Sequence, residues 1–170
     1  APLYNAETSS RLSAIKAAAQ EEATSIQNST KLLQANYSAR LISVRDYYAQ
    51  QRDLAARDQK LQEETLQKQI DYLQSRSASG KDQVNINKQI TELEAQLAKV
   101  RSEGAAAAQV LAVQENSVLK SRQLAVDAYK ASLDQSVEAS QRGYDAQVAR
   151  IGLGQREAEI MQAVAAVEAE

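Results

Sequence analysis

Apolar residues recur along the chain at the three- and four-residue spacings of an α-helix. In the most regular stretch the apolar positions advance by four, three, four and three residues from Ile86 to Val100. This is the heptad spacing that lets two helices pack along a continuous seam. Neither end of the chain shows the Val-, Ile- and Thr-rich alternation of a β-strand. The pattern therefore predicts an all-α protein built from long, paired helices.

Turn and cap signals divide the first half of the chain into two predicted helices. Loosely helical spacing predicts an N-terminal helix over residues 1–40. Ser43 follows two apolar residues and precedes Asp46 by three positions, which is the spacing of an N-terminal cap. We therefore expect a second helix over residues 43–77.

Small and flexible residues mark two further boundaries. The run from Ser75 to Gly80 combines turn-forming residues and predicts a turn, after which a long helix is expected over residues 82–151. Gly152 and Gly154 each disfavour a helix interior by about 1 kcal/mol relative to Ala. We therefore expect a break there and a C-terminal helix over residues 155–170.

The short turn near Ser79 predicts an antiparallel hairpin, because helices joined by a few residues must be antiparallel neighbours. Folding about this turn would place Leu73 opposite Ile86 and Leu61 opposite Leu97. The fold class is thus a long antiparallel helical hairpin, or coiled coil, with additional helices at both ends. The predicted hairpin seam consists of Leu61, Leu66, Ile70, Leu73, Ile86, Ile90, Leu93 and Leu97.

A second set of apolar residues follows the seam along the same long helix. Its spacing repeats every eleven residues, close to the natural twist of an α-helix. The second helix would run out opposite about residue 115, so the cover for this surface must be the N-terminal helix, another chain, or both. We expect self-association through it. This apolar stripe consists of Val126, Tyr129, Leu133, Val137, Tyr144, Val148 and Ile151.

The composition argues against an enzyme. The chain has no His and no Cys, which excludes a histidine base, a thiolate nucleophile and a zinc site of soft or imidazole ligands. Acidic groups such as Glu63 with Glu64, or Glu92 with Glu94, lack the spacing of a calcium loop and suit a solvated helix face. We predict no catalytic residues, no metal and no cofactor.

Charge and hydropathy limit the kinds of partner that we expect this chain to bind. With 20 Lys and Arg against 22 Asp and Glu, the chain carries no basic stripe for nucleic acid. Tyr47 and Tyr48 stand near Arg45 and Arg52, as in a base-stacking platform, but adjacent helical residues point about 100° apart, which favours packing. No apolar run approaches the ~18 residues that cross a bilayer, so no membrane segment is expected in this chain.

Two motifs stand out along the chain. In residues 41–54 an apolar-apolar-Ser cap leads into a helix that carries Tyr47 and Tyr48. In residues 150–156 a Gly-Leu-Gly element precedes a basic, Ala- and Glu-rich helix. Both motifs resemble elements of the tail tape-measure proteins of lambda-like long-tailed bacteriophages. The order of the two elements is similar to that family, whereas residues 1 to about 35 carry no family hallmark. The long apolar segment of full-length members is absent, so we expect a segment of a longer protein.

The resemblance implies a structural role in a phage tail. Helical copies of such proteins lie in the lumen of the tail tube and set its length, which implies homo-oligomers, contacts with tail-tube or tail-assembly proteins, and assembly in the bacterial cytoplasm. Two alternatives remain: the helical hairpin of a periplasmic adaptor protein, and a generic coiled-coil spacer. Neighbouring genes would discriminate among the three, because tail genes or transporter genes would lie alongside.

Overall fold

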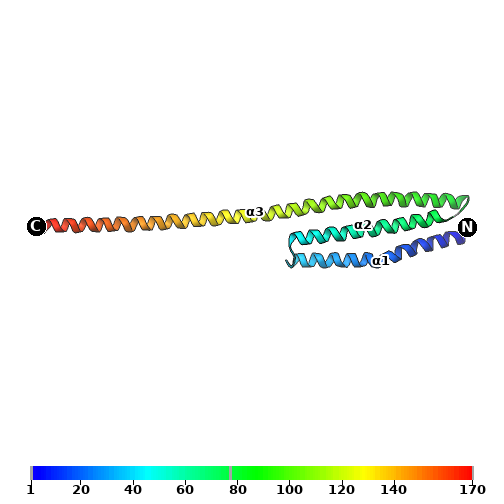
Figure 1. Ribbon diagram of the computed structural model, residues 1–170, viewed down its shortest axis with the longest axis horizontal. Coiled ribbons are helices and arrows are strands. Elements are labelled where there is room, and N and C mark those ends of the chain that lie inside the picture. The colour runs from blue at the N-terminus through cyan, green and yellow to red at the C-terminus, as the bar shows by residue number, and fades with distance from the viewer. Residues whose placement is uncertain (1, 77, 170) are drawn as a thin grey trace. The chain divides into compact units, whose positions relative to one another are not determined.

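The computed structural model describes residues 2–76 and 78–169, which form three α-helices and contain no strand. Helix α1 spans Pro2–Ser38, α2 spans Val44–Ser75 and α3 spans Lys81–Glu168 (Figure 1). The predicted all-α class is confirmed. Among the described residues, no helix combines the length and the apolar character needed to cross a membrane.

Helix α1 ends in a left-handed cap. The backbone N–H of Arg40 donates to Tyr37 O at 3.0 Å, and that of Leu41 donates to Asn36 O at 2.9 Å. These two bonds form the Schellman arrangement, in which the residue that reverses the chain adopts positive φ. Here that residue is Arg40, with φ of 60°. The bonds satisfy two carbonyls that the helix end would otherwise leave without donors.

The predicted cap of the second helix is present. The backbone N–H of Asp46 donates to Ser43 Oγ at 3.1 Å, and α2 begins at the next residue, Val44. At the other end, Arg76 adopts an extended conformation, and Gly80 has φ of 61° immediately before α3 begins. A residue without a Cβ adopts this left-handed conformation without strain, so Gly80 lets the chain reverse direction there.

Helix α3 does not break where we expected. It runs from Lys81 through Gly152 and Gly154 to Glu168, so the division into helices over residues 82–151 and 155–170 is not observed. Each Gly costs only about 1 kcal/mol in a helix interior, and the surrounding Ala, Glu, Gln and Arg residues are strong helix formers. Two Gly residues do not outweigh that local preference.

The chain divides into two compact units, Ala1–Leu119 and Lys120–Glu170, and α3 contributes residues to both. In the first unit α1 packs closely on α2 (Figure 1). Gln69 Nε2 donates to Leu12 O, and the Tyr37 and Tyr47 rings stack, so these two helices run antiparallel. Helices α2 and α3 are joined by two ion pairs, Arg52 with Glu115 and Glu63 with Arg101, which also require an antiparallel arrangement.

All three helices contribute to the hydrophobic core of the first unit. Tyr47 stacks on Tyr37 with ring centroids 4.0 Å apart and meets Tyr48 edge to face at 5.0 Å. Such aromatic pairs stabilise a core beyond their buried area. The core therefore lies where the end of α1, the start of α2 and the middle of α3 meet. Its buried members are Ile26, Leu33, Val44, Tyr47, Tyr48, Leu54 and Leu111.

The predicted hairpin seam lies inside the first unit, with a different register. All eight seam residues are buried or half-buried, and Leu73 is fully buried. We expected Leu61 to face Leu97, but α3 presents Gly104 to Gln59 and Arg101 to Glu63, which sets Leu61 opposite about residue 103. The expected pairing of Leu61 with Leu97 assumes that the chain reverses its direction at the middle of the turn. The extended backbone at Arg76 shifts the point of reversal along the chain.

Candidate interaction surfaces

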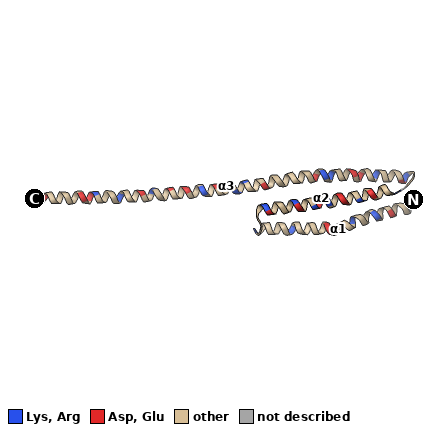
Figure 2. Ribbon diagram, in the orientation of Figure 1, with Lys and Arg blue, Asp and Glu red and all other residues tan. Residues whose placement is uncertain are grey.

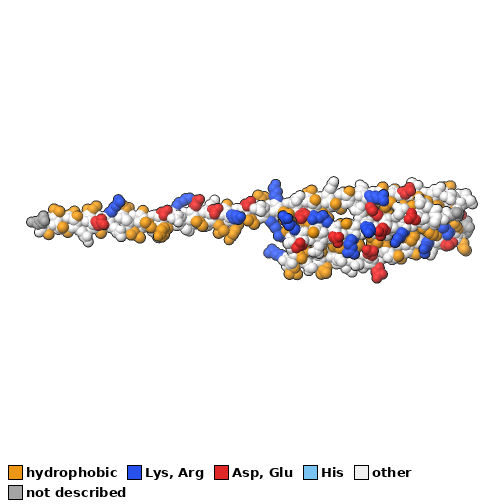
Figure 3. Space-filling view, viewed as in Figure 1, with side chains coloured by type: hydrophobic (Ala, Val, Ile, Leu, Met, Phe, Trp, Pro, Cys, Tyr) orange, Lys and Arg blue, Asp and Glu red, His pale blue; other side chains and the backbone are white. Residues whose placement is uncertain are grey.

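The apolar stripe occupies the second unit and is exposed along its whole length. The exposed fraction of its side chains ranges from 46% at Leu133 to 66% at Val137. Figure 3 shows hydrophobic side chains recurring along this part of α3, separated by isolated charges. Single exposed apolar residues are ordinary, but seven on one helix face form a contiguous patch of the kind that marks an interaction site.

A row of carboxylates borders this stripe. At about 100° per residue, the row lies about 100° clockwise from the stripe when α3 is viewed from its N-terminal end. Its opposite border carries small or neutral residues such as Ser132 and Ser136, and Lys130 lies between the row and the stripe. We call the row the acidic edge, which consists of Asp127, Asp134, Glu138 and Asp145.

A groove runs along the first unit between α1 and α3, with α2 as its floor. Two hollows of about 560 and 670 Å³ meet at Asp58 on the floor and define this central groove. Apolar residues from all three helices line it, including Ala23, Ile26, Leu54, Ala107 and Val110. A concave, largely apolar channel between helices suits another helix.

The walls of the central groove differ in charge. Its α1 wall carries Lys16 and Lys31 and no lining carboxylate, whereas its α3 wall carries both Lys99 and Glu103. Elsewhere on the helices acidic and basic residues are interspersed (Figure 2). The α1 wall is therefore a basic border about 15 residues, or ~22 Å, long.

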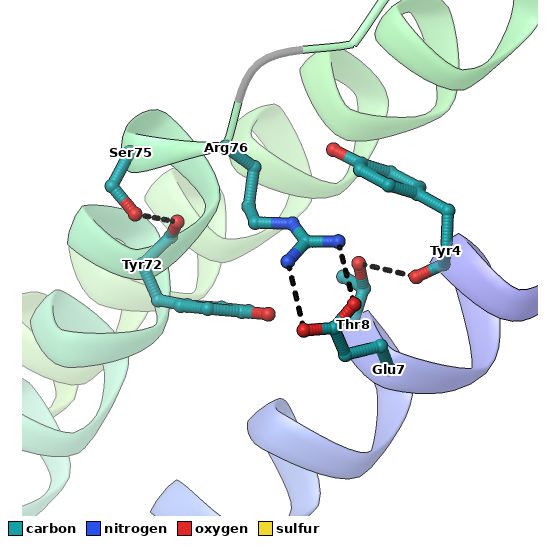
Figure 4. A network of polar contacts seen from close by, with 6 residues as sticks. All are labelled: Tyr4, Glu7, Thr8, Tyr72, Ser75 and Arg76. Carbon is teal, nitrogen blue, oxygen red and sulfur yellow. Dashed lines mark hydrogen bonds and ion pairs between the residues drawn. The ribbon is translucent and has the colours of Figure 1, made fainter.

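Arg76 ties the start of α1 to the end of α2. Its guanidinium lies 4.2 Å from the centre of the Tyr4 ring and 5.8 Å from that of Tyr72, within cation–π range. The same group pairs with the Glu7 carboxylate at 3.4 and 3.5 Å (Figure 4). The Tyr4 phenol and the Glu7 carboxylate raise the pKa of Arg76, which remains a cation and acts as a clasp.

A second polar contact borders the core. Arg52 pairs with Glu115, whose side chain is only 16% exposed, close to the buried ring of Tyr48. Burial raises the pKa of the Tyr48 phenol, and the nearby Tyr37, Tyr47 and Glu115 raise it further. Tyr47 and Tyr48 thus serve packing, as the helical geometry indicated, and are not free to stack on a ligand.

The remaining acidic residues do not form a reactive cluster. Glu63 accepts a hydrogen bond from Gln59 Nε2 and pairs with Arg101, so its carboxylate joins two helices. Residues 2–76 and 78–169 contain no group of three carboxylates arranged to hold a metal. Gly152 and Gly154 lie inside a helix, a conformation unlike that of a phosphate-binding loop.

Sequence patterns indicated the stripe and missed the central groove and the Arg76 clasp. The stripe lies on one helix, so its spacing alone defines it. The groove requires knowing which faces of three helices meet, and the Arg76 clasp joins residues 69 positions apart. The aromatic neighbours Tyr4 and Tyr72 carried no local signal for that contact.

Comparison with protein-family models, with curated proteins and with solved structures finds no match to this chain.

Proposed function

We propose that this chain is a structural segment of a phage-tail tape-measure protein and acts by helical self-association through the apolar stripe. It catalyses no reaction and binds no cofactor. One observation carries the proposal: α3 is an uninterrupted 88-residue helix whose apolar stripe is exposed. The two resembling motifs supply the link to phage tails.

A continuous helix suits a ruler because its rise is fixed at about 1.5 Å per residue. The continuity of α3 through Gly152 and Gly154 supports this role, since a break would make the rise indefinite. Antiparallel helices add little net length, so the helices within residues 2–119 would have to separate and extend during assembly to count toward the tail length. A change of length within residues 119–151, which lie on one continuous helix, therefore tests the ruler role more directly.

The test is a change in helix length measured in assembled tails. Removing residues 130–140, one eleven-residue unit, keeps the phase of the remaining stripe and should shorten the tail by about 16 Å. A single inserted eleven-residue unit should lengthen it by about 16 Å. Tail length is measured by electron microscopy of the phage that encodes the chain.

A variant of unchanged length, Gln135→Ala, is the control and should leave the tail length as it is. Viable phage whose tails keep their length after the eleven-residue deletion would contradict the ruler. A neighbourhood of transporter genes, in place of tail-tube and tail-assembly genes, would favour the periplasmic adaptor hairpin instead.

A further inference from the structure

We propose that the apolar stripe of one copy docks as a fourth helix into the central groove of a second copy, parallel to α2. This inference rests on the proposed self-association and names the surface that receives the stripe. Both surfaces belong to the same chain and are complementary in form: one is a convex apolar helix face, the other a concave apolar channel. Such a contact is heterologous, because it joins two different patches.

The groove is long enough for the acidic edge and for most of the stripe. The groove is lined along α3 from Gln96 to Gln114, which spans about 27 Å of helix. The acidic edge, from Asp127 to Asp145, is also about 27 Å long, whereas the stripe, from Val126 to Ile151, is about 38 Å long. A docked helix would therefore bury the central part of its stripe and leave about 10 Å of the stripe outside the groove.

The charges fix the direction of the docked helix. Viewed from the N-terminal end of α2, Gln59 and Glu63 lie clockwise from Asp58 on the floor and reach α3, whereas Leu61 lies anticlockwise and adjoins α1. A helix parallel to α2, with its stripe facing the floor, turns its acidic edge toward α1. Only this direction sets the acidic edge against the lysine wall.

The same direction gives a familiar packing. A helix parallel to α2 is antiparallel to both α1 and α3, which completes an up-down-up-down four-helix bundle. Antiparallel pairing of two stripes is less favourable, because the two acidic edges would lie side by side and like charges disfavour that contact. A parallel pair keeps the acidic edges apart but sets each one against a border of small or neutral residues, with no basic surface opposite. The lysine wall makes the groove the better partner.

A single heterologous contact leaves one stripe and one groove of the pair unoccupied. Further copies therefore add, and the assembly either closes into a ring or continues as an open series. Two exposed positions allow each surface to be blocked separately. Ala55→Glu places a bulky charge on the floor beneath the docked stripe, and Val137→Asp places a charge at the centre of the stripe. Both sites are exposed, so neither change disturbs the buried core.

The test is sedimentation velocity of the full chain and its variants. The unmodified chain should form a concentration-dependent series, and each variant alone should associate at least tenfold more weakly. An equimolar mixture of the two variants should form a dimer and nothing larger, since only one intact stripe and one intact groove remain. Ala49→Glu and Gln135→Asp make the same kinds of change outside the two surfaces and should behave as the unmodified chain.

Charge exchange tests the direction. Replacing Lys16 and Lys31 by Glu should weaken association, as should replacing Asp134 and Asp145 by Lys. Combining both exchanges in one chain should restore association, because every contact then joins a Glu wall to a Lys edge. Failure of that rescue would overturn the parallel placement.

Three further outcomes are decisive. If the Ala55→Glu variant associates as strongly as the unmodified chain while Val137→Asp does not, stripes pair with stripes; the groove contact is then wrong and the proposed function stands. A variant mixture that forms no dimer also contradicts the groove contact alone. An unmodified chain that stays monomeric at high concentration contradicts both the contact and the proposed self-association.

Discussion

At the scale of single residues, the fold depends on a few side chains and backbone angles that local sequence does not reveal. Ser43 was predictable because a cap needs only its own neighbours. Arg40 was not, because Gly is the usual residue at a left-handed helix end and the sequence offers none there. The Arg76 clasp likewise depends on Tyr4 and Glu7, which approach it only after α1 has folded onto α2.

Replacing Arg40 by Gly should stabilise the first unit. A left-handed conformation costs an L-residue about 1–2 kcal/mol, and the greater freedom of Gly in the unfolded chain offsets about half of that. We expect a gain of about 0.5–1 kcal/mol, read from the urea midpoint of the full chain. Arg40→Val should shift the midpoint the other way. Equal midpoints for Gly and Val would contradict the positive φ.

The Tyr48 phenol should make stability depend on alkaline pH. Its pKa is raised in the folded chain, so the neutral form is favoured there, while the unfolded chain ionises near pH 10. This contribution is present below about pH 10 and is lost as the pH rises through the folded pKa. Tyr48→Phe should show a smaller loss in urea titrations between pH 9 and 11. Tyr129→Phe, at an exposed position, is the control and should follow the unmodified chain.

At the scale of elements, helical periodicity defined which residues would be buried and not how far each helix would slide along its neighbour. All eight residues of the predicted seam are buried or half-buried, because a face is fixed by the 3.6-residue turn. Register depends on the geometry of residues 76–80, where extended and left-handed backbone replaces helix. The break expected at Gly152 and Gly154 is wrong, because the Ala, Glu, Gln and Arg residues around them favour a helix by more than two Gly residues disfavour it.

Disulfide trapping should report the observed register. Gln59 and Gly104 lie against each other, so Gln59→Cys with Gly104→Cys should cross-link within one chain under mild oxidation. The pairing predicted from the sequence would instead bring position 66 close to position 93. In the observed register Leu66→Cys with Leu93→Cys should therefore react more slowly. Faster reaction of the second pair, or cross-links found only between chains, would contradict the arrangement of α2 and α3.

At the scale of the whole molecule, the first unit has a core from three helices, whereas residues 120–168 expose nearly every side chain. Long helices draw most of their stability from packing an apolar face, which is why we propose a partner for this exposed face. Sequence periodicity indicated the exposed face itself. It could not indicate the groove that we propose as its partner, because the central groove exists only once α1, α2 and α3 have packed.

Amide hydrogen exchange of the full chain at low and at high protein concentration tests the central claim most directly. If the stripe mediates self-association, peptides covering residues 126–151 should exchange much more slowly at high concentration, because packing raises the free energy of local opening. Peptides covering the buried core around Tyr47 and Leu54 should change little and serve as the internal reference. Exchange over residues 126–151 that is the same at both concentrations, while sedimentation shows larger species, would contradict the account.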